Sequence, residues 1–132
     1  MATLQRPLGR NPASRYLRWA SGFAALSGHS LHKMGAVVVR NGNLIGGGSN
    51  QNRSHPRSKA YEHMIHAELA ALLSAGLVQG TAYGDLYVVR ITRGGAMATS
   101  KPCNDCMDLI HEAGISSIIY IDSQGIIRKE KT

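Results

Sequence analysis

The sequence predicts an α/β domain built on a mixed sheet of five strands, with helices on its faces. Helical and strand patterns follow one another in the order α-β-β-α-β-α-β-β, which is typical of this class. The last two predicted strands are separated only by the turn 122–125, which is too short for a crossover helix, so they should be antiparallel neighbours. A chain of 132 residues supports one core, and we expect a single domain over residues 1–132, with residues 1–11 flexible.

The first half of the chain predicts a helix followed by a β-hairpin. Apolar residues recur at helical spacing over 12–27, and the only tryptophan, Trp19, should be buried on this helix. Two strands over 34–48 should flank the turn Asn41-Gly42, because both of these residues tolerate positive φ. Gly46-Gly47-Gly48 lacks the Lys-Ser/Thr that completes a phosphate-binding loop. We therefore expect these glycines to allow another element to approach the backbone closely.

The second half predicts two further helices, each opened by a motif with metal-binding residue types. The expected elements are a helix over 64–75, a strand over 85–91, a helix over about 103–113, and strands over 118–121 and 126–127. The polar and basic stretches 49–61 and 92–101 should be exposed loops, and loops beside a site often select the substrate.

Composition limits the class of protein and of partner. Fifteen basic against eight acidic side chains give a formal charge of +7, which favours anionic partners, from a nucleotide to a nucleic acid. No apolar run approaches the roughly 20 residues of a membrane span, and the N-terminus does not resemble a signal peptide. We therefore expect a cytoplasmic protein without a membrane partner, in which both cysteines are reduced.

The first motif is His66-Ala67-Glu68 and the second is Pro102-Cys103-Asn104-Asp105-Cys106. His66, Cys103 and Cys106 supply the three protein ligands of a zinc site whose fourth position stays open for water. Residues 66 and 68 lie about 200° apart on a helix, so both can face one site only in the first turn. Zinc makes bound water acidic enough to attack near neutral pH, and Glu68 is free to move the protons.

The two motifs together are the signature of zinc-dependent nucleobase deaminases. Over residues 12 to about 128, the chain resembles the cytidine and deoxycytidylate deaminase superfamily. The resemblance implies a three-layer α/β/α cytidine-deaminase-like fold, a Zn²⁺ cofactor held by His66, Cys103 and Cys106, and Glu68 as proton shuttle. It also implies that the backbone of Ala67 lies against the base, that Asn50 binds the sugar, and that the chain forms a homo-oligomer.

Two markers of the substrate branch disagree. Histidine at position 66 resembles the deoxycytidylate, tRNA and polynucleotide branches, whereas the predicted terminal hairpin resembles the free-cytidine type. Arg53, Ser100 and Lys101 are further candidates for substrate contact. The basic Arg53 and Lys101 flank the proposed entrance and could hold a phosphate. Aromatic residues make up only 5% of the chain, which argues against stacking on single-stranded nucleic acid.

The first hypothesis is therefore the hydrolytic deamination of cytosine to uracil in a (deoxy)cytidine nucleotide or nucleoside, a small-molecule substrate. A second hypothesis is a deaminase acting on cytosine or adenine within single-stranded DNA or RNA. A third is a non-catalytic, zinc-stabilised nucleic-acid-binding module. Two other readings stay open: a structural zinc site with His63 or His111 as a fourth ligand, and a metal-free redox Cys-x-x-Cys pair. His29 and His32 should be solvated loop residues, with a place near the substrate as the alternative.

Overall fold

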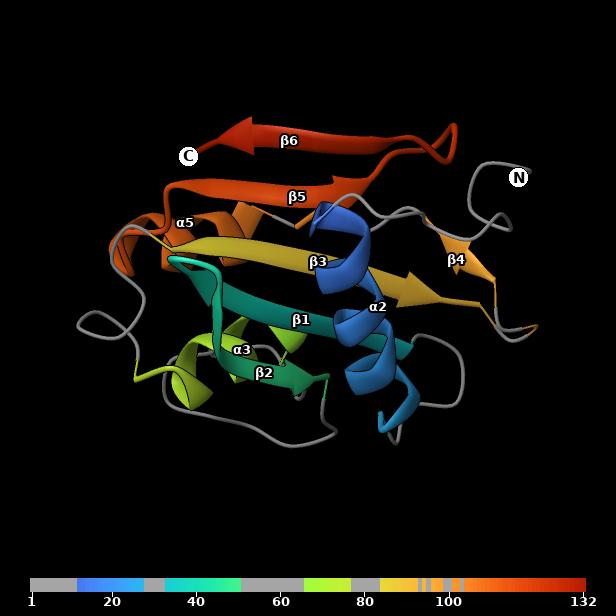
Figure 1. The fold of residues 1–132 in the computed structure, drawn as a ribbon, viewed down its shortest axis with the longest axis horizontal. Coiled ribbons are helices and arrows are strands. Elements are labelled where there is room, and N and C mark those ends of the chain that lie inside the picture. Colours follow the sequence, from blue (N-terminus) through green and yellow to red (C-terminus); the bar gives the residue numbers. More distant parts are fainter. Residues whose placement is uncertain are drawn as a thin grey trace.

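The chain forms a mixed sheet with helices on both faces (Figure 1). The computed structural model describes residues 12–27, 33–50, 66–76, 84–92, 94, 96–98, 101–102 and 104–132. The helices are α2 (Pro12–Ala25), α3 (Ala67–Ser74) and α5 (Asn104–Glu112). The strands are β1 (Lys33–Arg40), β2 (Asn43–Ser49), β3 (Asp85–Ile91), β4 (Met97–Ala98), β5 (Ser117–Ile121) and β6 (Ile127–Lys131).

The five predicted strands lie in the order β2-β1-β3-β5-β6. Strands β3 and β5 are parallel, whereas β1 is antiparallel to both of its neighbours. The last pair, β5 and β6, is antiparallel, which confirms the prediction made from the short turn between them. The hairpin turn is also confirmed, because Asn41 and Gly42 have φ values of 53° and 76°.

The loop 92–101 contains a strand that the sequence pattern did not predict. Met97 pairs with Ile91, and Ala98 pairs with Arg90, so β4 extends the sheet beside the end of β3. The N–H of Thr92 donates to the carbonyl of Ala96 at 2.9 Å, and this bond closes the intervening turn. A strand of two residues is too short to leave an alternating pattern in the sequence.

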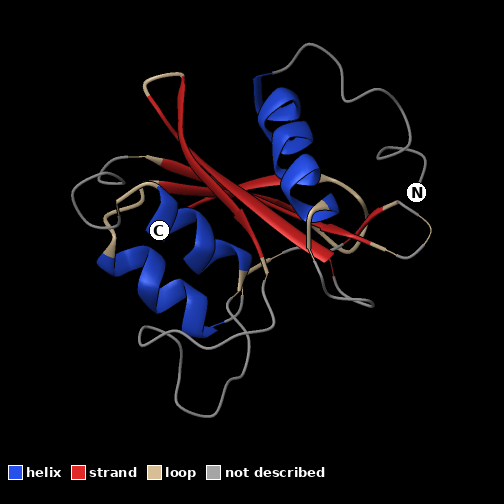
Figure 2. Ribbon diagram, turned by 90° about the horizontal axis from the view of Figure 1, so that it is seen from below, coloured by secondary structure: helices blue, strands red, loops and turns tan. Residues whose placement is uncertain are grey.

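The helices cover opposite faces of the sheet, so the fold has three layers (Figure 2). Helix α2 packs on one face, where Val37 and Val39 of β1 contact a cluster that includes Leu17. Helices α3 and α5 pack on the other face, onto the alternate residues of β1 and β3. This alternation follows from the two-residue period of a strand, and it gives the fold two separate cores. Among the described helices, none is long and apolar enough to cross a membrane.

The three consecutive glycines of β2 let both helix layers approach the strand. A Cβ added to Gly46 would lie 2.6 Å from the Cβ of Ala75 on α3, and one added to Gly48 would lie 2.5 Å from the Cβ of Ala70. A Cβ on Gly47 would instead overlap the ring of Phe23 on α2. The expected close approach is therefore confirmed, and helices cover both faces of the strand where a phosphate would have to bind.

Helix α2 differs from its prediction in the environment of Trp19. The helix ends at Ala25, and the N–H of Ser27 still donates to the carbonyl of Ala24. The prediction that Trp19 is buried is wrong, because its side chain is 41% exposed. Tyr16 and Ala20 face the sheet instead, and the Trp19 ring packs edge-on against Tyr16 with 5.4 Å between the centroids.

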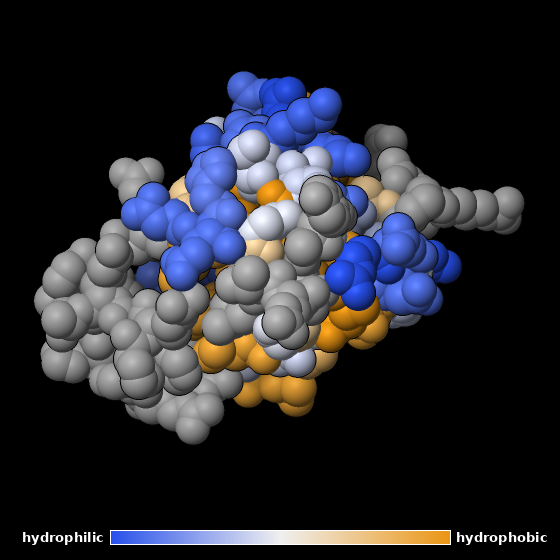
Figure 3. Space-filling model, turned by 90° about the vertical axis from the view of Figure 1, so that its left-hand side faces the viewer, coloured by the Kyte–Doolittle hydropathy of each residue, from blue (hydrophilic) through white to orange (hydrophobic). Residues whose placement is uncertain are grey.

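Strand β6 forms one edge of the sheet and carries four consecutive exposed charged residues, Arg128 to Lys131. Figure 3, which views the molecule from the left of Figure 1, shows hydrophilic surface along this upper edge. Charged side chains on an edge strand oppose its pairing with other strands.

Candidate active site and metal centre

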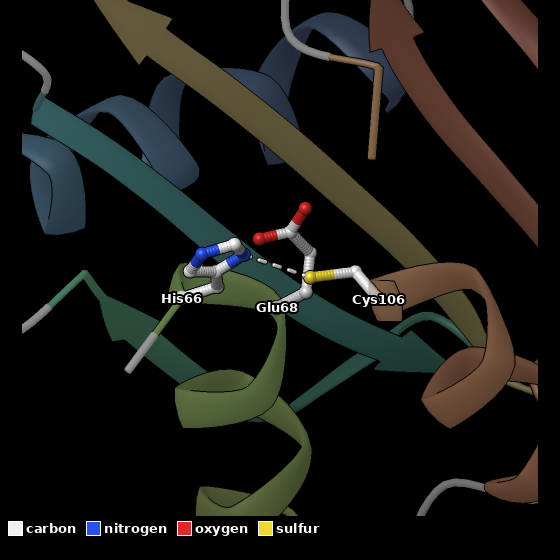
Figure 4. Close-up of side chains that lie close together, drawn as sticks. All are labelled: His66, Glu68 and Cys106. Carbon is white, nitrogen blue, oxygen red and sulfur yellow. Dashed lines mark hydrogen bonds between the residues drawn. The ribbon is translucent and has the colours of Figure 1, made fainter. Parts of the chain in front are cut away.

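The N-terminal ends of α3 and α5 meet on one face of the sheet and bring together His66, Glu68 and Cys106 (Figure 4). One ligand atom of each residue lies within 4.8 Å of those of the other two. The closest pair is His66 Nδ1 and Cys106 Sγ, which are 3.1 Å apart. Residues 40 positions apart in the sequence thus form one cluster of metal-ligating types.

The local structure of α3 explains how two residues of one motif reach the same site. His66 is the N-cap and has an extended backbone, with no side-chain capping bond to its own helix. Glu68 follows in the first turn, and the intervening Ala67 is fully buried. The prediction that the motif occupies the opening turn is confirmed. The partial positive charge at this helix end favours a carboxylate or another anion nearby.

Burial dominates the electrostatics of Glu68. Its side chain is 2% exposed, and no described residue donates a hydrogen bond to Oε1. Burial raises the pKa of the Glu68 carboxyl, while its own backbone N–H, the nearby His66 and a bond with Cys106 oppose that rise. A buried carboxylate oxygen without a donor is costly, so this atom needs a partner beyond the described residues.

The donor set fits a zinc ion. Typical distances of about 2.3 Å to sulfur and about 2.0 Å to nitrogen, at tetrahedral angles, place two such ligand atoms about 3.5 Å apart. The 3.1 Å between Nδ1 and Sγ is within a few tenths of an ångström of that spacing, so a small opening would admit the ion. Cys103, the third predicted ligand, lies outside the described residues. The buried Pro102 and the start of α5 at Asn104 bracket its position.

Asn50, the predicted sugar-binding residue, is 2% exposed and is held by the end of α2 and by β1. Its Oδ1 accepts hydrogen bonds from the Ser27 hydroxyl at 2.6 Å and from the Met34 N–H at 3.0 Å. Its own N–H donates to the Met34 carbonyl at 3.2 Å. Oδ1 therefore already serves two donors within the protein.

Lys101, another predicted substrate contact, lies in a cluster that the sequence did not indicate. Its Nζ is 3.5 Å from Glu130 Oε2 and 5.8 Å from the centre of the Tyr120 ring. The Tyr120 hydroxyl donates to Glu130 Oε1 at 2.9 Å, and burial raises the pKa of Tyr120. The antiparallel pairing of β5 with β6 brings Tyr120 close to Glu130. The sequence predicted a last strand of residues 126–127 only, so it could not indicate this contact.

The other candidates divide between described and undescribed residues. Arg53, Ser100, His29, His32 and His63 lie outside the described residues, so their predicted roles stay predictions. His111 is exposed in the last turn of α5 and does not belong to the group of His66, Glu68 and Cys106, so the structure does not support it as a fourth ligand.

Residues 10–122 match the family described as the "Cytidine and deoxycytidylate deaminase zinc-binding region". The chain belongs to this family. It is therefore a deaminase of the cytidine and deoxycytidylate type, and the group formed by His66, Glu68 and Cys106 fits the Zn²⁺ of the family's zinc-binding region.

Solved structures share the fold of this deaminase-family chain. A deoxycytidylate deaminase from the cyanophage S-TIM5 is 24% identical, with 84% of this chain and 82% of that chain covered and a TM-score of 0.65. A cytidine deaminase from Burkholderia pseudomallei is 21% identical, with coverages of 89% and 90% and a TM-score of 0.66. At these identities the likeness establishes the fold alone. Comparison with curated protein sequences gives no significant match.

Proposed function

We propose that this chain hydrolyses the exocyclic amine of cytosine, converting a (deoxy)cytidine nucleotide or nucleoside to its uracil form with release of ammonia. The observation that carries the proposal is the buried Glu68 carboxylate, whose Oε1 receives no hydrogen bond from a described residue and lies beside His66 and Cys106. The family's zinc-binding region supports this assignment.

In the proposed site, the His66 imidazole and the Cys106 thiolate hold the metal together with Cys103. When bound, zinc would make water acidic enough to supply a hydroxide nucleophile near neutral pH. His66 is suited to this role because its extended N-cap backbone leaves the imidazole free of capping and directed at Cys106. Cys106 is buried in the first turn of α5, and this fixes the position of its thiol.

Glu68 is proposed as the proton carrier for every step. Its carboxylate accepts a proton from the attacking water and passes it to the ring nitrogen beside C4 of cytosine, as the water oxygen bonds to C4. Glu68 then takes the proton of the hydroxyl now on C4 and gives it to the exocyclic amine. The bond between C4 and that nitrogen breaks, the C4 oxygen becomes the carbonyl of uracil, and ammonia leaves. Burial raises the pKa of Glu68, which favours proton uptake, and the positive charge of a bound metal opposes that rise.

A small anionic substrate suits the charge of the chain. The formal charge of +7 favours a phosphate-bearing ligand over a neutral one. The cyanophage deoxycytidylate deaminase has also been crystallised in complex with dCMP and dUMP, and we extend that substrate class to this chain. Lys101 could contact such a phosphate if its ammonium left Glu130, and both groups are about half exposed, so the ion pair is weak.

The test is an ammonia-release assay of the zinc-loaded protein on deoxycytidylate, cytidylate, deoxycytidine, cytidine and a single-stranded oligonucleotide. We expect turnover on at least one of the cytosine mononucleotides or nucleosides, and its loss in Glu68→Ala with the fold retained. Turnover on the oligonucleotide alone would favour the polynucleotide hypothesis. No turnover on any substrate, with zinc bound, would leave the non-catalytic module as the better account.

A further inference from the structure

A shallow apolar groove of about 370 Å³ lies between α2 and β2. Three of the four large hydrophobic side chains that the described residues expose border it: Trp19, Leu26 and Leu44, which are 41%, 75% and 41% exposed. The remaining lining residues are Arg18, Gly22 and Phe23. Large apolar side chains that gather in one hollow, rather than scattering over the surface, indicate a binding surface.

The groove is separate from the deaminase site. Helix α2 packs on the sheet face opposite to that covered by α3 and α5, which carry Glu68 and Cys106. The two surfaces are therefore divided by the sheet itself, as Figure 2 makes clear for the helices. A ligand bound in the groove would therefore be different from the substrate of the deaminase site.

Among the described residues, the charged side chains of α2, β2 and the adjacent β1 are all basic: Arg15 and Arg18 on α2, and Lys33 and Arg40 on β1. Residues 1–61 contain nine Lys and Arg and no Asp or Glu, whereas residues 62–132 contain six basic and eight acidic side chains. The first part thus carries a formal charge of +9 and the second −2, which together give +7. Helix α2 and strand β2, which line the groove, lie wholly within the basic part. The asymmetry predicts a polyanionic occupant.

Trp19 is placed to contact a flat ring. Its side chain is exposed beside Arg15, whose guanidinium lies 5.8 Å from the centre of the Trp19 ring and 5.0 Å from that of Tyr16. An exposed indole with two arginines in the preceding turn of the helix, Arg15 and Arg18, is a combination by which proteins hold an unpaired base and its phosphates.

Aromatic residues make up only 5% of the chain, yet a single exposed indole is enough to stack one base. We propose that the groove between α2 and β2 binds single-stranded nucleic acid, with a base on Trp19 and phosphates on Arg15 and Arg18. In a duplex the bases stack on one another, so no base face is available to stack on the indole. A second copy of this chain would bring the same positive charges to the same surface. The proposal does not depend on the deaminase activity, because the groove and the site lie on different faces.

The test uses the fact that Trp19 is the only tryptophan, so its fluorescence reports on the groove alone. The probe is fluorescein-labelled oligodeoxythymidylate of about 20 nucleotides, enough for more than one contact site. At about 50 mM salt we expect quenching of Trp19 and a dissociation constant of roughly 1–100 µM. The matched duplex and inorganic polyphosphate should bind at least tenfold more weakly and leave the fluorescence unchanged.

Two matched double variants distinguish binding in the groove from nonspecific attraction to the positive charge of the chain. Arg15→Gln with Arg18→Gln should weaken oligonucleotide binding and lower the slope of log K against log salt by about 1.4, or 0.7 for each lost phosphate contact. Lys129→Gln with Lys131→Gln removes the same charge from β6 and should change neither. Trp19→Ala should weaken binding roughly 5- to 150-fold, followed by anisotropy of the label.

Each contrary result would overturn the proposal. These results are equal losses in the two double variants, equal affinity for duplex or polyphosphate, or no binding at low salt. A Trp19 signal that depends on protein concentration without oligonucleotide would assign the groove to a second copy instead. Ammonia release from a mononucleotide should be unchanged in Arg15→Gln with Arg18→Gln, so a failure of the deaminase assignment would be seen separately.

Discussion

Replacing Gly48 by alanine should damage the active site from the far side of α3. A Cβ at Gly48 would lie 2.5 Å from the Cβ of Ala70 and 2.8 Å from its carbonyl carbon. Ordinary carbon contacts are about 3.5–4.0 Å, so α3 must withdraw by about 1 Å at this point. Ala70 is two residues beyond Glu68 on the same short helix, so the carboxylate moves with it.

We expect Gly48→Ala to lower stability by about 1–3 kcal/mol, as overpacking does. For a domain of this size, that loss lowers Tm by about 4–12 °C. A displacement of about 1 Å at a catalytic group can cost about 100-fold in rate, and we expect a loss of that order in kcat/KM well below Tm. The assays are a thermal melt followed by Trp19 fluorescence and ammonia release at saturating zinc.

The matched control is the neighbouring Gly47→Ala. Its Cβ would meet the ring of Phe23 on α2, which lies on the opposite face of the sheet. This variant should also be destabilised, yet it should keep its activity below Tm because α3 stays in place. Full activity in Gly48→Ala, or equal loss of activity in both variants, would refute the argument that the glycines of β2 set the position of Glu68.

Three further predictions concern stability. Asp122 accepts hydrogen bonds from the N–H of Ile126 and the side chain of Arg128, and these bonds lower the pKa of its carboxyl. The ionised carboxylate therefore stabilises the fold above about pH 4, and this stabilisation is lost as the pH falls through the pKa of the folded state. Asp122→Asn should therefore be less stable than the parent at neutral pH, with the difference disappearing in acid; parallel melting curves from pH 7 to pH 2 would contradict this. Gly22→Ala should stabilise the chain by about 0.5–1 kcal/mol, because an added Cβ meets nothing within 4 Å inside α2, and a lower Tm would count against it. Asn50→Ala should cost about 2 kcal/mol in urea unfolding, because a backbone N–H of β1 and a buried hydroxyl lose their acceptor; a loss below about 0.5 kcal/mol would contradict that role.

Local signals in the sequence predicted much of the fold and the position of the site. The turn at Asn41-Gly42 is encoded by two residues that tolerate positive φ, and both have it. The spacing of His66 and Glu68 required the opening turn of a helix, and α3 begins at Ala67. In each case the physical constraint acts within a few residues, so a pattern in the sequence can carry it.

Contacts between distant segments could not be predicted in this way. Helical spacing identified the apolar stripe of α2 but not its borders, so Trp19 was placed inside although Tyr16 and Ala20 occupy the face toward the sheet. The fixing of Asn50 depends on Ser27, which is 23 residues away in the sequence. Such partners are chosen by how the elements pack, and the sequence near Asn50 carries no sign of them.

The role of Glu68 as proton carrier is tested most directly by ammonia release from Glu68→Gln, with the bound zinc of the same sample determined by atomic absorption. Glutamine keeps the shape of the side chain but cannot carry the proton. If Glu68 is the proton carrier, the variant should retain the parent's zinc content and thermal stability while its rate falls by about 10²- to 10⁴-fold. A zinc-loaded Glu68→Gln that released ammonia at the parental rate would show that Glu68 does not carry the proton.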